Sequence, residues 1–289
     1  MILRRFISFV VIAVTVSACG NPGVNINNAP YDPKIAVEGY LYCGKPVRDI
    51  KLMRNFPIGT QVDGSKINLT PSGNNVIATI NGSTLSFDPQ TQTYYNNQMA
   101  VEYGKSYTLD VSATVDGVQL HTTSTTTTPL PGFAVAEKAL GTFRYNSDSI
   151  AIDFTPSPGT TNYIFSVAPD SVSTENFIYD NVYTSRLDSA IVAKNMNNYK
   201  YGGSILTDIS SQTRTSFSYK IENYFTWFYT SYRVIVYAAD KNFANYVLTA
   251  PSVQEFDGNF HEPVLIFRGD GIGVFASAII DTVRFTITK

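Results

Sequence analysis

The sequence predicts a mostly β protein with two domains. Of its 289 residues, 44% are hydrophobic and 15% are charged, and 19 Tyr and 18 Phe are present. Aromatic, Thr and Val residues lie in short alternating runs between clusters of Gly, Pro, Asn and Asp, a pattern that favours antiparallel strands over helices. The length provides material for more than one hydrophobic core. We therefore expect an N-terminal immunoglobulin-like β-sandwich, then a second antiparallel β domain with long loops and one short helix.

Residues 1–18 have the layout of a bacterial lipoprotein signal peptide. The basic pair Arg4-Arg5 precedes an apolar run, Phe6–Val16, which is shorter than the roughly 20 residues needed to span a bilayer. Small residues at positions 17 and 18 precede Cys19, as in a lipobox whose cysteine becomes the lipidated N-terminus. We expect lipidation of Cys19. The alternative is an ordinary signal peptidase, which would cut the same bond without adding lipid.

The residues that follow Cys19 are polar and have little to bury. Residues 19–33 are therefore predicted to be a flexible tether between lipid and fold. Because the chain has 2 Cys, lipidation of Cys19 leaves Cys43 unable to form an internal disulfide. We interpret Cys43 as a small buried hydrophobic residue.

Residues 34–130 are expected to form the immunoglobulin-like sandwich. Lys34–Leu41 alternates as a first strand, and a turn at residues 44–46 leads into a second strand. Alternate positions from 107 to 115 share one apolar face, and Asp116-Gly117 predicts a type I′ hairpin turn. The threonine-rich run Thr122–Thr128 suits a last strand, which Pro129 and the residues after it cannot continue.

Residues 131–289 are expected to form the C-terminal β domain. Alternating apolar positions predict strands at 150–154, 163–167, 232–238 and 283–288. One helix is predicted over 240–248, because Asp240 can cap its start and Pro251 lies just beyond its end. The segment Arg268–Phe275 contains three glycines without the residues of a phosphate loop. We expect these glycines to allow a bulge or tight turn before the last strands.

The sequence lacks an evident catalytic constellation, and we expect no cofactor and no metal site. Its two histidines, His121 and His261, fall in different predicted domains. The formal net charge of −2 argues against nucleic acid as a partner. Three acidic residues, Glu255, Asp257 and Glu262, cluster in one stretch. A solvated acidic loop is the default interpretation, and a pair of glycosidase carboxylates is the alternative.

The densest aromatic run, residues 224–232, is a candidate binding surface. In a strand, alternate rings point to opposite faces, so one set can fill the core while another forms a platform for a sugar ring or a protein. The candidate residues are Tyr224, Trp227, Tyr229 and Tyr232. Packing of the same rings in the core or on the sheet surface is the default interpretation, and the binding platform is the alternative.

A family resemblance rests on the order of several motifs. These are Lys34–Leu41 after the lipobox, Tyr103–Asp110 before the hairpin turn, Asn162-Tyr163, Glu262-Pro263 and Gly269–Phe275. In this order the chain resembles the domain-of-unknown-function 4249 family, lipoproteins of Bacteroidota whose genes often lie beside those of TonB-dependent receptors. The resemblance implies an outer-membrane lipoprotein that assists uptake of a ligand, and it implies no catalytic residues. Asp270 stands where related chains often have a glycine.

Four Asp-Ser/Thr-apolar triplets match the acceptor pattern for O-glycosylation in that lineage. The acceptor residues are Ser149, Ser171, Ser189 and Thr282. Residues 20–23 lack the acidic side chains associated with surface export in that lineage, so whether the protein faces the periplasm or the surface stays open.

The function expected from the sequence is that of a non-enzymatic lipoprotein anchored to the outer membrane through Cys19. It would be an accessory or ligand-binding partner of a TonB-dependent receptor in nutrient uptake, with a glycan or a peptide as ligand. The alternatives are a surface adhesin or structural lipoprotein and, less favoured, a carbohydrate-active enzyme.

Overall fold

The computed structural model describes residues 31–57, 59–145, 150–180, 187–200, 204–210, 214–222, 225–250, 264 and 266–289. The contacts divide the chain into two units. Pro33–Asn55 and Asp63–Lys289 form the larger unit, which contains every strand and helix described below. The smaller unit combines Met1–Asp32 with Phe56–Val62.

The described chain is mostly β, as the sequence predicts. Its strands are β1 (Ile35–Tyr42), β2 (Pro46–Arg54), β3 (Ile77–Ile80), β4 (Ser83–Thr84), β5 (Ser86–Asp88), β6 (Thr93–Ala100), β7 (Ser106–Val115), β8 (Val118–Thr127), β9 (Ala134–Val135), β10 (Ala139–Arg144), β11 (Ile150–Thr155), β12 (Asn162–Pro169), β13 (Ser204–Asp208), β14 (Phe217–Ile221), β15 (Ser231–Ala239), β16 (Phe267–Gly269) and β17 (Gly271–Thr288). Its helices are η2 (Gly64–Lys66), α2 (Pro71–Asn74), α3 (Ser189–Lys194), α4 (Met196–Tyr199) and α5 (Lys241–Thr249).

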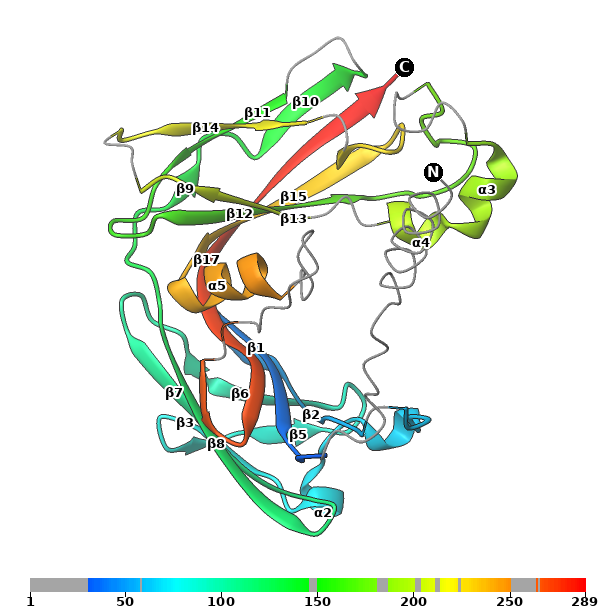
Figure 1. The fold of residues 1–289 in the computed structure, drawn as a ribbon. Coiled ribbons are helices and arrows are strands. Elements are labelled where there is room, and N and C mark those ends of the chain that lie inside the picture. The colour runs from blue at the N-terminus through cyan, green and yellow to red at the C-terminus, as the bar shows by residue number, and fades with distance from the viewer. Residues whose placement is uncertain are drawn as a thin grey trace, which may run out of the picture. The chain divides into compact units, whose positions relative to one another are not determined.

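The strands form three sheets, and one of them runs through both halves of the sequence (Figure 1). This large sheet has the order β13-β12-β15-β17-β1-β2-β6-β5, with β10 also paired to β17. A second sheet, β16-β8-β7-β3-β4, and a third, β14-β11-β9, complete the fold. Most pairs are antiparallel, but β17 pairs with both β1 and β10 in parallel.

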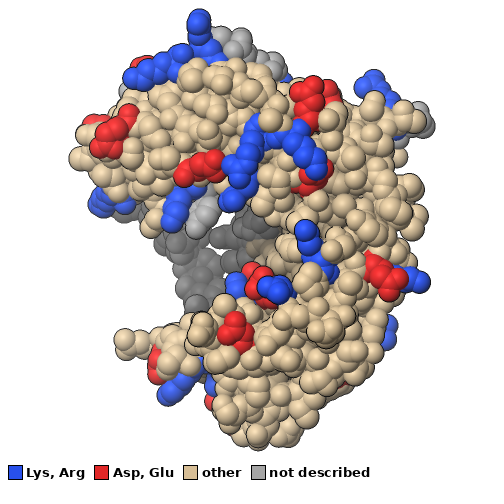
Figure 2. All heavy atoms as spheres, turned by 180° about the vertical axis from the view of Figure 1, so that it is seen from behind, with Lys and Arg blue, Asp and Glu red and all other residues tan. Residues whose placement is uncertain are grey.

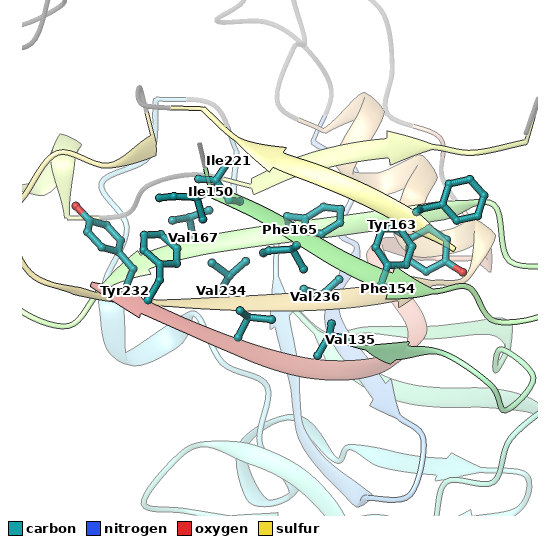
Figure 3. Close-up of a cluster of buried hydrophobic side chains, with 14 of the residues drawn as sticks. Val135, Ile150, Phe154, Tyr163, Phe165, Val167, Ile221, Tyr232, Val234 and Val236 are labelled. Atoms are coloured by element: carbon teal, nitrogen blue, oxygen red, sulfur yellow. The ribbon is translucent and has the colours of Figure 1, made fainter. Parts of the chain in front are cut away.

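Two large hydrophobic cores lie between these sheets. One draws on residues 35–120 together with Phe275, and the other on residues 133–287 together with Cys43. In the second core, side chains of β12 and β15, including Phe165 and Val236, point toward Phe154 of β11 (Figure 3). Each core thus includes one residue from the other side of the expected boundary between residues 130 and 131, and β17 pairs with β1 across it.

The predicted hairpin is present with its predicted turn. Strands β7 and β8 pair from Ser106↔Thr127 to Val115↔Val118. Asp116 and Gly117 have φ values of +50° and +81°, as a type I′ turn requires. The apolar positions of β7, from Tyr107 to Val115, are buried on one face.

The threonine-rich run Thr122–Thr128 covers the end of β8 and the next residue. Every second side chain of the run points inward. Its inward-facing hydroxyls are buried, and each donates a hydrogen bond to another part of the chain. The pairs are Thr122 to the Arg268 carbonyl (2.9 Å), Ser124 to the Ile266 carbonyl (3.1 Å), Thr126 to the Asp240 carboxylate (2.6 Å) and Thr128 to the Glu102 carbonyl (2.8 Å). Hydroxyls replace apolar groups here because buried carbonyl and carboxylate oxygens require donors.

Three buried tyrosines near the starts of strands make the same contact. Tyr107, Tyr163 and Tyr232 each accept a hydrogen bond on the phenolic oxygen from a backbone N–H four to six residues earlier. The donors are Glu102 (2.7 Å), Ser157 (2.8 Å) and Phe228 (2.8 Å). This is the geometry of the tyrosine corner of immunoglobulin-like sandwiches, where the ring fills the core and the hydroxyl fixes the incoming loop.

The glycines of residues 268–275 lie at a turn, as predicted, and they also lie where the backbone packs closely against other strands. Gly269, the last residue of β16, has φ +84°, and Gly273 has φ +101° beside β1. A Cβ on Gly271 would overlap the Thr122 hydroxyl, and one on Gly273 would overlap the Val37 carbonyl. Only glycine therefore permits β17 to approach β8 and β1 this closely. Asp270 pairs with Lys34 at 3.6 Å and contributes to this junction.

The predicted helix is α5, and Asp240 caps it. The Asp240 carboxylate accepts hydrogen bonds from the Phe243 N–H (2.9 Å), the Ser277 N–H (3.1 Å) and the Thr126 hydroxyl (2.6 Å). Burial raises the pKa of Asp240, while these donors act in the opposite direction. One side chain thus fixes the start of α5 to both β17 and β8.

We predict that Gly273→Ala destabilises the protein by about 2 kcal/mol or more. A side chain at positive φ costs about 1–2 kcal/mol, and overpacking against Val37 adds about 1–3 kcal/mol. The melting temperature should fall by about 4 °C or more in thermal denaturation. Gly64→Ala is the control, since that position has no positive φ and an added Cβ would meet no atom within 4 Å. Equal melting temperatures for Gly273→Ala and the unaltered protein would contradict the packing described.

Candidate functional site

The outer face of the large sheet carries a group of tyrosines. On β1 the residues Ile35, Val37 and Leu41 are buried in the core, so the alternate positions Tyr40 and Tyr42 lie on the opposite face. Their partners on β17 are Ala276 and Ala278, in register with Tyr40 and Tyr42. Small side chains on β17 leave room for the larger rings beside them.

Helix α5 packs against one part of this face (Figure 1). The Phe243 ring lies 4.9 Å from that of Tyr40 and 5.3 Å from that of Tyr237 on β15. Tyr42 and Tyr237 are 6.3 Å apart between ring centroids. These aromatic contacts, two tilted and one edge-to-face, hold the rings in place while leaving the tyrosines only partly buried.

Five tyrosines of this face have hydroxyls that form no hydrogen bond to any other described residue. They are Tyr40, Tyr42, Tyr95, Tyr237 and Tyr246. The contrast with Tyr107, Tyr163 and Tyr232 is clear, since those hydroxyls are engaged by backbone groups. Tyrosines that are half-buried and keep a free donor and acceptor are suited to a ligand with both apolar and polar groups.

Beside Tyr40 and Tyr42 the surface is hollowed into a groove of about 590 Å³, called here the tyrosine groove. It is lined by Glu38, Tyr40, Tyr42, Lys45, Pro46, Arg48, Asp49 and Lys51. Glu38 and Lys51 face each other across β1 and β2 with 3.1 Å between the carboxylate oxygen and the ammonium nitrogen. The volume lies within the range of small-molecule sites, about 300–1,000 Å³.

A β-bulge in β2 places two of the lining residues. Val47 and Ile50 are both buried, although residues three positions apart in a regular strand face opposite sides of the sheet. The pairing with β6 shifts between them, and Asp49 has φ +57°. The bulge therefore exposes Arg48 and Asp49 together at the rim.

A second groove of about 310 Å³ continues from the same rim. Arg48 and Asp49 line both hollows, and the second is completed by Asp88, Thr91, Thr93, Tyr95 and Asn97. Tyr95 lies on β6 next to Tyr94, which is buried, so Tyr95 faces outward. The two grooves thus form one continuous face across β1, β2 and β6.

The charges at this face are mixed in sign. Three cationic and two acidic side chains line the tyrosine groove. On the face of the molecule shown in Figure 2, basic and acidic side chains are likewise interspersed and form no broad patch of one sign among the described residues. Neither a polyanion nor a strongly cationic ligand would find matching charge at the groove.

A larger hollow of about 710 Å³ lies at the start of α5, between the end of β8 and the start of β12. Its lining is rich in Thr, Asn and Pro, with Asp240 and Lys241 as the charged members. The Asp240 carboxylate is occupied by internal hydrogen bonds, and the Asn242 amide donates to the carbonyls of Thr125 (2.8 Å) and Phe275 (3.0 Å). These groups hold the fold together, so the tyrosine groove is the better candidate for binding.

The aromatic run proposed from the sequence has another role in the structure. Residues 225–230 do not continue a strand, so their rings do not alternate between two faces as expected. Tyr232 is fully buried and stacks on Phe285 at 5.2 Å, which corrects its assignment to an exposed surface. Trp227 packs against Tyr199 at 5.4 Å, in a small cluster around Phe228.

Tyr229 is partly buried and has the Lys289 ammonium 5.6 Å from its ring centroid. Tyr224 lies outside the described residues. The default interpretation, packing in the core, thus describes Tyr232. The described residues of the run form no continuous platform.

Most of the other candidate residues lie outside the described part of the chain. His121 is 58% exposed and lies 3.2 Å from Asp110, whereas His261, Glu255, Asp257 and Glu262 fall outside the described residues. Cys43 is buried, and burial raises the pKa of its thiol to about 11. Among the residues that the structure describes, no three His, Cys, Asp or Glu side chains are grouped so that they could hold a metal ion.

The four predicted O-glycosylation acceptors have different environments. Ser171 and Ser189 are exposed, and Ser189 begins α3, which Asp188 caps. Thr282 is only half-exposed within β17, opposite Ile235, and Ser149 lies outside the described residues. Glycosylation at these positions stays a prediction.

Comparison with known proteins identifies the family. Residues 23–268 match the model of a domain of unknown function, DUF4249. The chain belongs to this family. No curated protein matches the sequence of this DUF4249 member.

Solved structures offer only weak likenesses to the DUF4249 chain. Domains 4 and 5 of the S-layer protein SbsC are 10% identical, with 90% of this chain and 98% of that chain covered and a TM-score of 0.22. Trypsin-activated α2-macroglobulin from Escherichia coli is 10% identical, with 91% and 16% covered and a TM-score of 0.24. The titin domains Z1Z2 in complex with telethonin are 10% identical, with 90% and 96% covered and a TM-score of 0.19. This chain spans about a sixth of the α2-macroglobulin chain.

The tyrosine groove is a site that sequence reasoning missed. The sequence predicts the strand Lys34–Leu41 and its buried positions, but it does not single out the outward positions as a site. The signal that could have found it is the pair Tyr40 and Tyr42, at a spacing of two on that outward face. Arg48 and Asp49 could not be predicted as site residues, because their side chains do not indicate a β-bulge.

We predict that the groove tyrosines make the protein less stable at high pH. Burial raises the pKa of Tyr40, Tyr42 and Tyr237 above the usual value near 10. Their contribution to stability is complete below pH 10 and is lost as the pH rises further, because the unfolded chain releases these protons first. Urea unfolding between pH 8 and 11 should show a falling free energy of unfolding.

The double variant Tyr40→Phe/Tyr42→Phe should reduce this pH dependence without removing it, since other buried tyrosines share it. Tyr103→Phe, at a 43% exposed tyrosine that lines neither groove, is the control. An unchanged slope in the double variant would show that Tyr40 and Tyr42 ionise equally in both states.

Proposed function

We propose that this protein is a non-enzymatic lipoprotein of the outer membrane that captures a ligand for a TonB-dependent receptor. The observation that carries the binding role is the tyrosine groove, with its mixed charges and with tyrosine hydroxyls that no other described residue engages. A protein that captures a ligand without catalysing a reaction requires such a binding surface but no catalytic residues. The lipobox at Cys19 and membership of the DUF4249 family support the anchored, receptor-associated part of the proposal.

In this proposal the lipid anchor determines where the protein is located in the cell. Within the described part of the chain, no helix is both long and apolar enough to cross a bilayer. A triacylated Cys19 would bury several acyl chains at about 0.8 kcal/mol per CH₂, which suffices for lasting attachment. The polar residues that follow Cys19 would then connect the lipid to the first strand, β1.

Non-enzymatic binding is favoured over the two alternatives by the arrangement of side chains. The carboxylates of Glu38 and Asp49 at the groove have cationic neighbours, and Glu38 is paired with Lys51 at 3.1 Å. As members of a mixed-charge rim, these carboxylates are suited to accept hydrogen bonds from a ligand. The glycosidase alternative concerns Glu255, Asp257 and Glu262, which lie outside the described residues. An adhesin would bind a surface polymer without a receptor partner. Association with a receptor therefore distinguishes the proposed function from that of an adhesin.

We predict that Cys19→Ser releases a folded protein from membranes. Without the thiol no diacylglyceryl group is attached, and the remaining polar segment has no affinity for lipid. Fractionation should find the variant in the membrane-free fraction, and circular dichroism should show an unchanged β spectrum. Cys43→Ala is the control, because it removes the other cysteine and should leave the protein bound to membranes. Retention of Cys19→Ser by membranes would contradict lipid anchoring.

We also predict that the tagged, lipidated protein recovers a TonB-dependent receptor from outer membranes. Extraction in mild detergent followed by affinity purification and mass spectrometry provides the measurement. The same purification with a tagged, unrelated outer-membrane lipoprotein measures the background of non-specific recovery. Recovery of no such receptor above that background would contradict the accessory role, and labelling at the cell surface without a receptor would favour an adhesin.

A further inference from the structure

We propose that the tyrosine groove and its continuation beyond Arg48 and Asp49 bind a neutral oligosaccharide of more than one sugar. This inference rests on the proposed function, since it names the class of ligand that the accessory protein captures. The first sugar lies against Tyr42, and the chain continues across the rim toward Tyr95.

The aromatic part of the groove matches the apolar side of a sugar ring. A pyranose has a face of C–H groups and a perimeter of hydroxyls, so it needs an aromatic surface together with polar partners. Tyr42 provides such a surface, and its hydroxyl forms no hydrogen bond to another described residue. Tyr40, supported by Phe243 at 4.9 Å, extends the same surface along β1.

The rim provides hydrogen-bond partners for hydroxyl groups. A hydroxyl both donates and accepts, so it is best bound by carboxylates beside cations. Asp49 and Glu38 can accept from sugar hydroxyls, while Arg48, Lys45 and Lys51 can donate to them. The two carboxylates offset two of the three cations, so the groove has little net charge to attract a phosphate or a sulfate, and a neutral ligand is the better fit.

The position of the groove within the sheet disfavours an extended peptide. β1 is paired on both sides, with β17 and β2, and β2 is paired with β1 and β6. A peptide that adds a strand needs a free edge with unpaired backbone groups, and neither of these two described strands offers one. Side chains form the walls of the groove, as a sugar requires.

The β-bulge accounts for the length of the site. Arg48 and Asp49 belong to both hollows, about 590 and 310 Å³ in volume, so the two are neighbouring subsites and not separate pockets. Asp49 keeps a left-handed backbone conformation at φ +57°, which few residues adopt without cost. Such backbone positions are concentrated at binding sites.

The test uses the full lipidated chain in a detergent without a sugar headgroup. Immobilised and soluble cellohexaose, xylohexaose, mannohexaose and maltohexaose are the probes, with the corresponding monosaccharides for comparison. We expect at least one hexasaccharide to bind by isothermal titration calorimetry, and more tightly than its monosaccharide. Tyr42→Ala and Asp49→Ala should each weaken binding about tenfold or more, as expected for a central contact.

Control variants separate binding from folding. Tyr42→Phe keeps the ring and should weaken binding less than Tyr42→Ala, whereas Tyr103→Ala, which lines neither groove, should bind as the unaltered protein does. Tyr95→Ala should reduce affinity for the hexasaccharide and not for the monosaccharide. Melting temperatures show whether each variant is folded.

Several results would overturn this inference. They are binding of no hexasaccharide by the unaltered protein, undiminished binding by folded Tyr42→Ala and Asp49→Ala, or loss of binding in Tyr229→Ala with Tyr42→Ala unaffected. Sugar binding without a receptor in the affinity purification would contradict the proposed receptor partnership alone. A receptor without sugar binding would contradict the ligand class alone.

Discussion

The structure depends on the pairing of β17 with strands from both halves of the sequence. β17 pairs with β15 along one edge, and along the other it pairs in parallel with β1 and then β10. Its inward residue Phe275 belongs to the first core, whereas Val283, Phe285 and Ile287 belong to the second. Glycines at its start permit the close approach to β1 and β8. The two cores therefore share β17, which contributes side chains to both.

This shared strand also determines the binding face. Because β1 and β17 are in register from Ile35↔Gly271 to Tyr42↔Ala278, small residues of β17 lie beside the tyrosines of β1. Asp240 then fixes α5 to β17, which places Phe243 against Tyr40. Each contact limits how far the rings can move. A groove held by several strands is preorganised for a ligand, which lowers the entropy lost on binding.

The sequence predicts features that depend on local chemistry. The type I′ turn at Asp116-Gly117, the capped helix after Asp240 and the glycine-dependent turn before β17 follow from nearby residues. The parallel pairing of β1 with β17 is not predictable in this way, because it joins strands from opposite ends of the chain and no local pattern specifies the partner. The aromatic run misleads because its period suggests a strand, whereas residues 225–230 form a loop packed against α3 and α4. The groove escapes prediction since the bulge at Asp49 is a tertiary feature.

The central claim is that β17 joins the two cores into one cooperative unit. Differential scanning calorimetry of the full chain tests it most directly. A shared strand requires both cores to unfold together, so we expect one transition whose calorimetric and van't Hoff enthalpies agree. Two separate transitions, each with its own enthalpy, would show that the cores fold independently and would contradict the account.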